Sequence, residues 1–150
     1  MSSPRSGRGR QSTDSILAGT SYELGSFHVT ENEIIEFASR WDPQDFHIDR
    51  AAAAAGHFGE VIASGVHTLA IFQRLAVDSV YGQWAVIGGR RLRDIEFRSP
   101  VRPGTTLIGG LLIKEIAAEN ETRSLVTAVG TLAAAGEVIL TVGVELYLLR

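Results

Sequence analysis

Asp42 and His47 are the two residues of this sequence whose types and spacing best suit acid–base chemistry. They flank the stretch Pro-Gln-Asp-Phe, and Pro43 disfavours helical geometry at Asp42, so the pattern predicts a loop between two helices. Histidine titrates near neutral pH, and a neighbouring carboxylate can orient the imidazole or share its proton transfers. This spacing is common in proteins, however. Taken alone it favours a solvated loop with a turn-capping aspartate.

Ser64 and Gly65 directly precede a long apolar stretch and form a second candidate feature. The first N–H groups of a helix lack internal partners and lie at the positive end of its dipole. A glycine there lets a ligand approach the backbone, so the N–H groups could polarise a carbonyl and stabilise an enolate-like charge. The alternative is structural: Ser64 caps the helix and Gly65 fits a tight corner.

The elements that must position these residues are helical in the first half of the chain. Thr30 and Glu33 form a capping box for a helix that ends at Asp42, and Asp49 can cap a short helix over residues 51–55. Residues 65–80 are apolar nearly all round, which predicts a buried helix. Strand patterns occupy residues 22–29, 92–97, 106–113, 124–133 and 138–149, with a tight reversal at Ala135-Gly136. The pattern predicts an α+β fold with one long helix against an antiparallel sheet.

Length and composition predict one globular domain. The chain has 150 residues, 45% hydrophobic and 21% charged, which excludes a disordered chain. Residues 1–13 are rich in Ser, Gly and Arg and are expected to form a disordered basic tail, leaving 14–150 as the single domain. The first 13 residues hold three arginines and no acid. The remainder therefore carries a more negative net charge than the −3 of the whole chain, which disfavours nucleic acid as a partner.

Several kinds of site and location are disfavoured by residues that the sequence lacks. It has no cysteine, which removes disulfides, thiolate metal sites and cysteine nucleophiles and fits a reducing compartment. No apolar run is long enough for a membrane span, and the start lacks the apolar core of a signal peptide, so we expect a cytoplasmic protein. His47, His57 and His67 are ten residues apart, which is not a local chelating spacing, so no metal is expected.

Three segments together resemble one known family. Asp42-Pro-Gln-Asp-Phe-His47 resembles the hydratase motif of the MaoC-like dehydratases, which include the R-specific enoyl-CoA hydratases and read Asp-any-Asn-Pro-aliphatic-His. Ile62-Ala-Ser-Gly-Val-His67 is similar to the family's entry into its central helix, and Arg98-Ser-Pro-Val-Arg-Pro-Gly-Thr-Thr-Leu107 to its strand–turn–strand. About residues 20–149 match in order and spacing.

The resemblance implies a hotdog fold, an antiparallel sheet wrapped around one long helix, in a homodimer or higher homo-oligomer with pockets near the interface. It implies reversible addition of water to a trans-2-enoyl thioester, on CoA or an acyl carrier protein, to give the R-3-hydroxyacyl thioester without metal or redox cofactor. Carried over by residue, Asp42 and His47 are the catalytic dyad and the Gly65 N–H belongs to the oxyanion hole. Ser64, His67 and Gln44 complete the expected substrate-binding set.

Two departures from the family motif leave other functions open. Gln44 stands where the motif has Asn, and Asp45 where it has Pro, which places a second carboxylate near His47. The protein could therefore be a non-catalytic acyl-thioester-binding homologue. A hotdog thioesterase is the weaker alternative, because such enzymes usually carry a carboxylate on or near the central helix and residues 65–77 contain no Asp or Glu.

A basic stretch in this acidic domain has two interpretations. Its arginines could bind carrier phosphates or acidic residues of a carrier protein, since guanidinium groups bind phosphate bidentately. Alternatively they form a solvated strand face paired with Asp94 and Glu96. The stretch comprises Arg90, Arg91, Arg93, Arg98 and Arg102. Trp41 and Phe46, beside the candidate dyad, are expected to pack in the core and the pocket wall.

Overall fold

The computed structural model describes residues 9–150 as a five-stranded sheet, one long helix and a group of short helices. The helices are α1 (Glu31–Trp41), α2 (Asp45–Ile48), α3 (Arg50–Ala55) and α4 (Gly65–Ser79), with 3-10 turns η1 (Thr13–Ser15) and η2 (Tyr81–Gln83). The strands are β1 (Ser21–His28), β2 (Val86–Phe97), β3 (Thr106–Ala118), β4 (Arg123–Ala134) and β5 (Glu137–Leu149). The predicted α+β class is confirmed.

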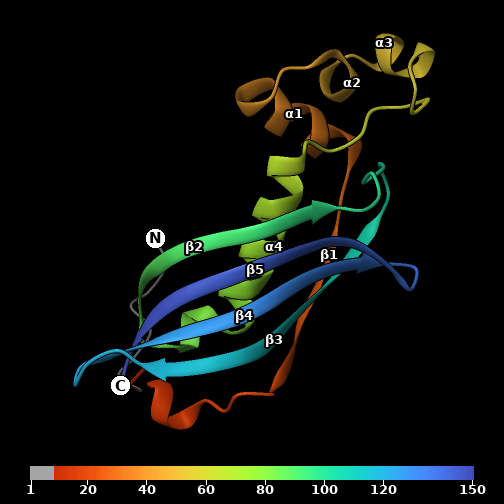
Figure 1. Cartoon of the computed structure of the whole chain (residues 1–150). Helices are drawn as coiled ribbons and strands as arrows, with labels where there is room; N and C mark the ends of the chain where they lie inside the picture. Colours follow the sequence, from red (N-terminus) through yellow and green to blue (C-terminus); the bar gives the residue numbers. More distant parts are fainter. Residues whose placement is uncertain (1–8) are drawn as a thin grey trace.

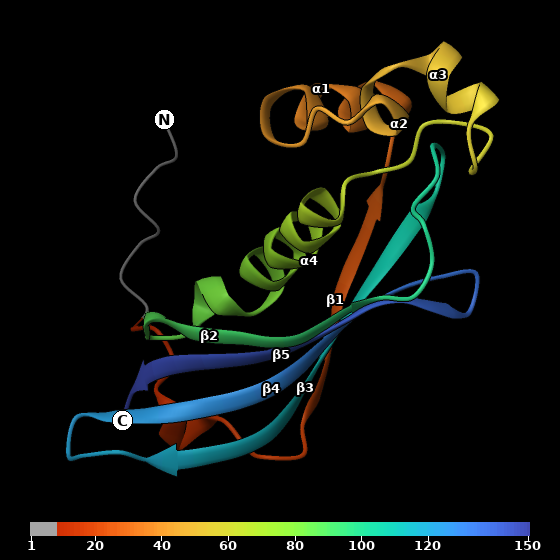
Figure 2. The same ribbon diagram turned by 45° about the horizontal axis from the view of Figure 1, so that its top comes forward.

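The sheet is antiparallel throughout and curves around α4. Its strand order is β1-β3-β4-β5-β2, so β1 and β2 form the two edges. Figures 1 and 2 show α4 lying along one face of the sheet, while α1, α2 and α3 gather beyond its N-terminal end. This is the hotdog architecture that the resemblance implies. It brings the α1–α2 connection and the start of α4 together at one end of the molecule.

The core forms between α4 and the inner face of the sheet. Phe72 is 1% exposed, and its ring lies against Gly130 of β4, where a side chain of any size would collide with it. Burial of one such ring contributes about 1.5–3 kcal/mol. The prediction that α4 is buried all round is wrong, because Val66 and Val77 are 59% and 40% exposed. A single sheet covers only one side of the helix.

Local sequence signals set several element ends as predicted. Thr30 and Glu33 form the capping box that begins α1, and the Asp49 side chain accepts a hydrogen bond from the Ala52 N–H at the start of α3. Ala135 and Gly136 both have positive φ, 50° and 80°, and so reverse the chain between β4 and β5. Two successive residues of this conformation make a turn whose twist matches that of antiparallel strands.

The predicted boundary of the basic tail lies too far along the chain. The Gln11 N–H donates to the Gln83 carbonyl and its own carbonyl accepts from the Ala85 N–H, while Thr13 is buried and donates to Ser124. The chain is therefore packed from Gln11 onward, because its backbone finds partners that composition cannot reveal. The rest of the predicted tail, residues 1–8, lies outside the described residues.

Two elements differ from the sequence expectation. The segment after Pro43, expected as a loop, contains the short helix α2. Strand β2 begins at Val86, six residues before the strand predicted from the alternation at Leu92. Within residues 9–150, no helix has both the length and the apolar character needed to cross a membrane.

Candidate functional site

Three polar side chains come together at one end of the molecule. They belong to the C-terminal end of α1, to the short helix α2 and to the residue before α4. Asp42 is the C-cap of α1, and its N–H donates to the Ala38 carbonyl. His47 lies on α2, and Ser64 directly precedes Gly65, the first residue of α4. His47 and Ser64 are 4% and 0% exposed, so the surrounding elements hold both of them rigidly.

The Asp42 carboxylate is the centre of this cluster. Its Oδ2 accepts a hydrogen bond from Ser64 Oγ at 2.7 Å, and its Oδ1 accepts one from Gln44 Nε2 at 2.7 Å. The hydrogen bond from Ser64 lowers the pKa of Asp42 most, followed by the one from Gln44, and the imidazole of His47 adds to the effect; partial burial opposes it. Asp42 is therefore ionised throughout the neutral range.

The backbone of the next loop determines the tautomer of His47. Its Nδ1 lies 2.6 Å from the carbonyl oxygen of Ile62. A carbonyl can only accept, so Nδ1 must carry the hydrogen and, in the neutral ring, Nε2 bears the lone pair. Nε2 faces Asp42 Oδ2 at 3.4 Å. Two acceptors thus face each other, and one water molecule could donate a hydrogen to each.

These groups line a cavity of about 440 Å³. Its walls are mainly apolar and come from α2, the 58–63 loop, the start of α4 and the end of β2. The lining includes Asp42, Gln44, Phe46, His47, Phe58, Ile62, Gly65, Thr68, Phe97 and Arg98. We call it the dyad cavity. Its volume is that of a small-molecule site, with few polar groups converging on one end.

Ser64 does not cap α4, contrary to the structural interpretation of this residue. Its hydroxyl donates a hydrogen bond to Asp42, and no side-chain cap is present at the helix N-terminus. The first N–H groups of α4, beginning with Gly65, therefore meet the dyad cavity without a capping partner. A Cβ on Gly65 would lie 2.8 Å from the Phe97 ring, so the glycine also allows that ring to pack against the first residue of α4.

The two departures from the family motif have different consequences. Gln44 reaches back to Asp42 and holds the second oxygen of its carboxylate. Asp45 is exposed at the start of α2, and among residues 9–150 no hydrogen bond or ion pair joins it to His47. The carboxylate that the sequence placed near His47 is therefore exposed and not bonded to that ring, whereas the amide of Gln44 is part of the cluster.

His67 does not line the dyad cavity. It is 7% exposed and stacks on Phe37 with ring centroids 4.4 Å apart, beside a separate hollow of about 310 Å³. Within the described residues its Nδ1 has no hydrogen-bond partner, and burial lowers its pKa while Glu33 opposes the effect. Its predicted part in substrate binding thus stays a prediction, and any such contact would be made from the far side of α4.

Comparison with known proteins identifies the family. The family model described as the MaoC like domain matches residues 15–135. The chain belongs to the MaoC-like domain family. A protein of Bacillus subtilis (strain 168), the uncharacterized YdeM, is 33% identical over 94 residues, which are 63% of this chain and 67% of that protein.

Solved structures share the whole fold of this MaoC-like chain. The MaoC-like dehydratase from Rhodospirillum rubrum is 27% identical with a TM-score of 0.81, and the match covers 93% of this chain and 97% of the other. An R-hydratase from Pseudomonas aeruginosa, in unliganded form, has a TM-score of 0.72 at 22% identity, covering 91% and 84%. At that identity the second likeness concerns the fold alone.

Sequence reasoning on this MaoC-like chain missed some residues and misplaced others. Phe97 and Arg98 line the dyad cavity from the end of β2, which only the β2–β5 pairing places there. Trp41, expected in the core, is 69% exposed, because α1 ends at the surface. The interpretation that pairs the β2 arginines with Asp94 and Glu96 is wrong for three of them. Arg90, Arg91 and Arg93 instead surround Glu145 of β5.

Removal of the Ser64 hydroxyl should raise the pKa of Asp42. In Ser64→Ala the largest cause of the lowered pKa is lost, while Gln44 and His47 remain. A lowered carboxyl pKa stabilises the fold at pH values above the ordinary 3.8, and this stabilisation is lost as pH falls through the folded value, so the variant should be less resistant to acid. A carboxyl titration by NMR measures the shift.

Ser79→Ala is the matched control, because its hydroxyl bonds the Leu24 carbonyl near the other end of α4. We expect this control to leave the Asp42 titration unchanged. An unchanged Asp42 titration in Ser64→Ala would contradict the role assigned to Ser64.

Proposed function

We propose that this protein is an acyl-thioester hydratase or dehydratase. In the hydration direction a water molecule adds to the β-carbon of a trans-2-enoyl thioester, and the α-carbon gains a proton. One O–H bond of water and the carbon–carbon π bond break, while a C–O and a C–H bond form. The product is the R-3-hydroxyacyl thioester, and no electrons are exchanged with a cofactor.

The observation that carries this proposal is the pair of acceptors at the end of the dyad cavity. Asp42 Oδ2 and His47 Nε2, 3.4 Å apart, can together hold one water by both its hydrogens. The water oxygen then points its lone pairs away from the dyad and into the cavity. One member removes a proton as the oxygen attacks, and the dyad returns a proton to the α-carbon on the same face of the substrate. Because the two groups are coupled, the base and the acid are not separately assigned.

The N-terminus of α4 supplies the second requirement of the reaction. Negative charge builds up on the thioester carbonyl oxygen as water attacks. The uncapped N–H of Gly65, at the positive end of a 15-residue helix, can donate to that oxygen. Donors of this kind contribute about 3 kcal/mol to transition-state stabilisation in other enzymes.

The cavity walls suit an acyl chain on a large carrier. Phe46, Phe58 and Phe97 provide apolar surface, and Arg98 lies at the same cavity with its guanidinium about half exposed. We propose CoA or an acyl carrier protein as the carrier, with the cytoplasm as the site of action. A thioesterase is disfavoured, because α4 carries no Asp or Glu between Gly65 and Val77.

One observation favours the non-catalytic alternative. Both oxygens of the Asp42 carboxylate already accept a hydrogen bond, from Ser64 and Gln44. Each of these bonds lowers the basicity of the carboxylate. An acyl-thioester-binding protein with a weakened dyad would show the same geometry, and only turnover separates the two functions.

The test is to mix the protein with crotonyl-CoA and longer trans-2-enoyl-CoAs and follow the absorbance of the conjugated thioester. We expect the absorbance to fall and chiral analysis to give the R-3-hydroxyacyl product. Binding of acyl-CoA without turnover at any chain length would support the binding protein. Release of free thiol would support the thioesterase. Either outcome would overturn the hydratase.

A further inference from the structure

His67 and Tyr81 each carry a buried polar atom that has no hydrogen-bond partner within residues 9–150. The two atoms are Nδ1 of His67 and the hydroxyl of Tyr81, and each residue lines a cavity other than the dyad cavity. A buried polar group without a partner costs stability, so a ligand that supplied the partner would gain affinity at either place. The charges around the two residues decide which kind of ligand fits.

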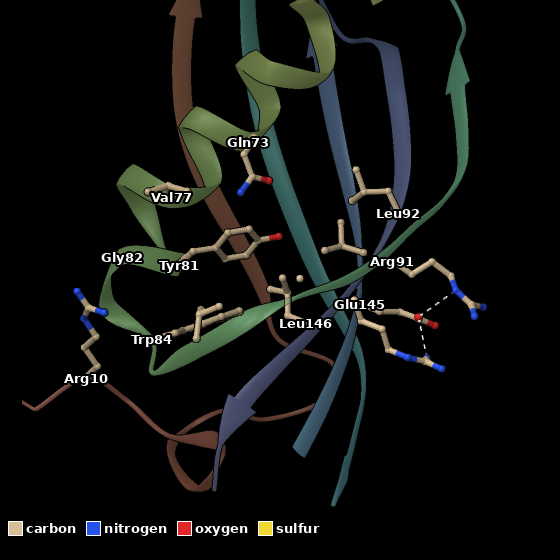
Figure 3. A pocket seen from close by; sticks show the side chains of 14 residues that line it. Arg10, Gln73, Val77, Tyr81, Gly82, Trp84, Arg91, Leu92, Glu145 and Leu146 are labelled. Carbon is tan, nitrogen blue, oxygen red and sulfur yellow. Dashed lines mark hydrogen bonds and ion pairs between the residues drawn. The ribbon is translucent and has the colours of Figure 1, made fainter. Parts of the chain in front are cut away.

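Tyr81 lies at a cavity of about 610 Å³ whose charged groups are mainly positive. Figure 3 shows Tyr81 projecting into this cavity from the end of α4. Arg10, Arg90 and Arg91 line it, and the single carboxylate of Glu145 already pairs with the last two. We call it the arginine-lined cavity. Because like charges repel, a cationic ligand is disfavoured there.

The hollow beside His67 has the opposite charge balance. We call it the α1 hollow, because most of its lining residues lie on that helix. Burial lowers the pKa of His67, so its ring is neutral at pH 7. The lining therefore holds two carboxylates against one guanidinium, which leaves one negative charge in excess. The lining comprises Phe27, Glu33, Glu36, Phe37, Arg40, Trp41 and His67.

Aromatic rings form most of the apolar wall of the α1 hollow. Phe37 stacks on His67, and Phe27 contributes a further ring from β1. Trp41 borders the hollow and is 69% exposed. A cation over the face of an aromatic ring is attracted by the quadrupole of the ring, and tryptophan attracts it most strongly. A ligand with one positive charge and an apolar body suits this wall.

The charged groups of the α1 hollow keep their capacity to bind a ligand. Within residues 9–150 neither Glu36 nor Arg40 forms an ion pair, although they are four positions apart on α1. Glu33 accepts one hydrogen bond through Oε2, at 3.4 Å from the Thr30 nitrogen, and its charge acts on His67. Both carboxylates therefore have acceptor positions to spare.

The neutral ring of His67 adds a directional acceptor to these charges. A neutral imidazole has one N–H donor and one lone pair. An ammonium group carries only donors, so the ring can accept one of its N–H bonds while the carboxylates accept others. A carboxylate or a phosphate ligand has no proton for that lone pair, and it would also face two groups of its own charge.

We propose that the α1 hollow binds a small organic cation, a primary amine on an aromatic or branched apolar body. The ammonium group lies among Glu33, Glu36 and His67, and the apolar body lies against Trp41. A dry cavity of about 150 Å³ holds one benzene ring, so a hollow of about 310 Å³ has room for a ring with an aminomethyl group. Among the described residues the hollow and the dyad cavity share no lining residue, so the inference does not rest on the proposed function.

Benzylammonium is the first probe, added to the protein at neutral pH and followed by NMR. The chain has two tryptophans, of which Trp41 borders the α1 hollow and Trp84 borders the arginine-lined cavity. Their two indole N–H signals therefore report the two places separately, and Trp41→Phe assigns them. We expect the Trp41 signal to shift and to saturate with a dissociation constant of about 1 mM, while the Trp84 signal stays in place.

Three probes of related shape test what the hollow recognises. Benzyl alcohol lacks the charge and should bind about fivefold more weakly, and benzoate should leave the Trp41 signal in place. Benzyltrimethylammonium keeps the charge but has no N–H to donate, so it should bind about tenfold more weakly than benzylammonium. No saturable shift of Trp41 with benzylammonium up to tens of millimolar would overturn the site. Equal affinity for benzyl alcohol or benzoate would overturn the recognition of a cation.

Two charge variants on α1 should change the affinity for benzylammonium in opposite directions. Glu36→Gln removes an attraction and should weaken binding about two- to fivefold, whereas Arg40→Gln removes a repulsion and should strengthen it by a similar factor. Both residues are exposed, so the fold should survive. Glu115→Gln, exposed on β3 and outside the hollow, is the control and should bind as the wild type does. Equal affinities in the Glu36 and Arg40 variants would contradict the proposal.

His67→Phe tests the acceptor, because phenylalanine can keep the stack on Phe37 while both ring nitrogens are lost. We expect benzylammonium to bind about tenfold more weakly and benzyltrimethylammonium to bind as before. Loss of affinity for both probes alike would mean that His67 only shapes the hollow, and would overturn its role as an acceptor. The Glu36 and Arg40 variants test the site even where His67→Phe fails to fold.

Discussion

Asp42→Asn should lower hydratase activity about a hundredfold or more, the usual contribution of a positioned acid or base. The amide has nearly the same shape as the carboxylate, but it cannot take a proton from water. It can also present its NH₂ group to the Ser64 hydroxyl or to the acceptor His47 Nε2, where the carboxylate only accepts. Initial rates with a trans-2-enoyl-CoA measure the loss, and circular dichroism checks that the fold survives.

His47→Gln should give a loss of similar size, and the double variant should lose little more than either single one. Groups that act as a unit on one water show this non-additivity. Asp45→Asn is the matched control, since Asp45 is exposed and forms no bond to His47 among the described residues. Near-wild-type rates in Asp42→Asn and His47→Gln would show that the dyad does not carry the chemistry.

Gly130→Ala should destabilise the fold by about 1–3 kcal/mol, the usual cost of overpacking a core. The added Cβ would lie 2.2 Å from Cζ of Phe72, a distance that no two such atoms adopt. Phe72 is 1% exposed and packs between α4 and the sheet, so its ring cannot move aside without displacing its neighbours. Thermal unfolding should show a melting temperature lower by about 3–10 °C.

Gly88→Ala is the control for this substitution, because it also lies in a strand and a Cβ there has no heavy atom within 4 Å. We expect Gly88→Ala to be neutral or slightly stabilising, since alanine loses less backbone entropy than glycine. Equal melting temperatures for Gly130→Ala and the wild type would mean that α4 can shift away from β4.

The motif Asp42 to His47 could be found from sequence because the proposed chemistry depends on a short local spacing. The short helix α2 carries His47 toward Asp42, and both departures from the family motif lie between these two residues. The positions that these two side chains take could not be read from the sequence. Gln44 points to the carboxylate and Asp45 points to solvent, and that difference depends on where α2 begins.

The ion pairs of the β2 arginines, in contrast, could not be predicted from the sequence. Their sequence neighbours Asp94 and Glu96 suggested local pairing, but the pairing of β2 with β5 places another carboxylate, buried on β5, against them. The nearest carboxylate for three of them belongs to Glu145, more than fifty positions later, brought there by the β2–β5 register. In the same way, α4 is apolar around most of its surface, yet one sheet covers only part of it.

The sequence by itself determined the α+β class, the family, the caps of α1 and α3, the β4–β5 turn and the choice of Asp42 and His47 as the candidate dyad. Each of these depends on residues within a few positions of one another, where dihedral preferences and hydrogen-bonding side chains act directly. Only the tertiary structure decided that Ser64 bonds Asp42 instead of capping α4, that the Ile62 carbonyl determines the His47 tautomer, and that Phe97 packs against Gly65. These contacts join segments up to tens of residues apart, and their geometry comes from how the α1–α2 connection packs against α4 and the edge of the sheet.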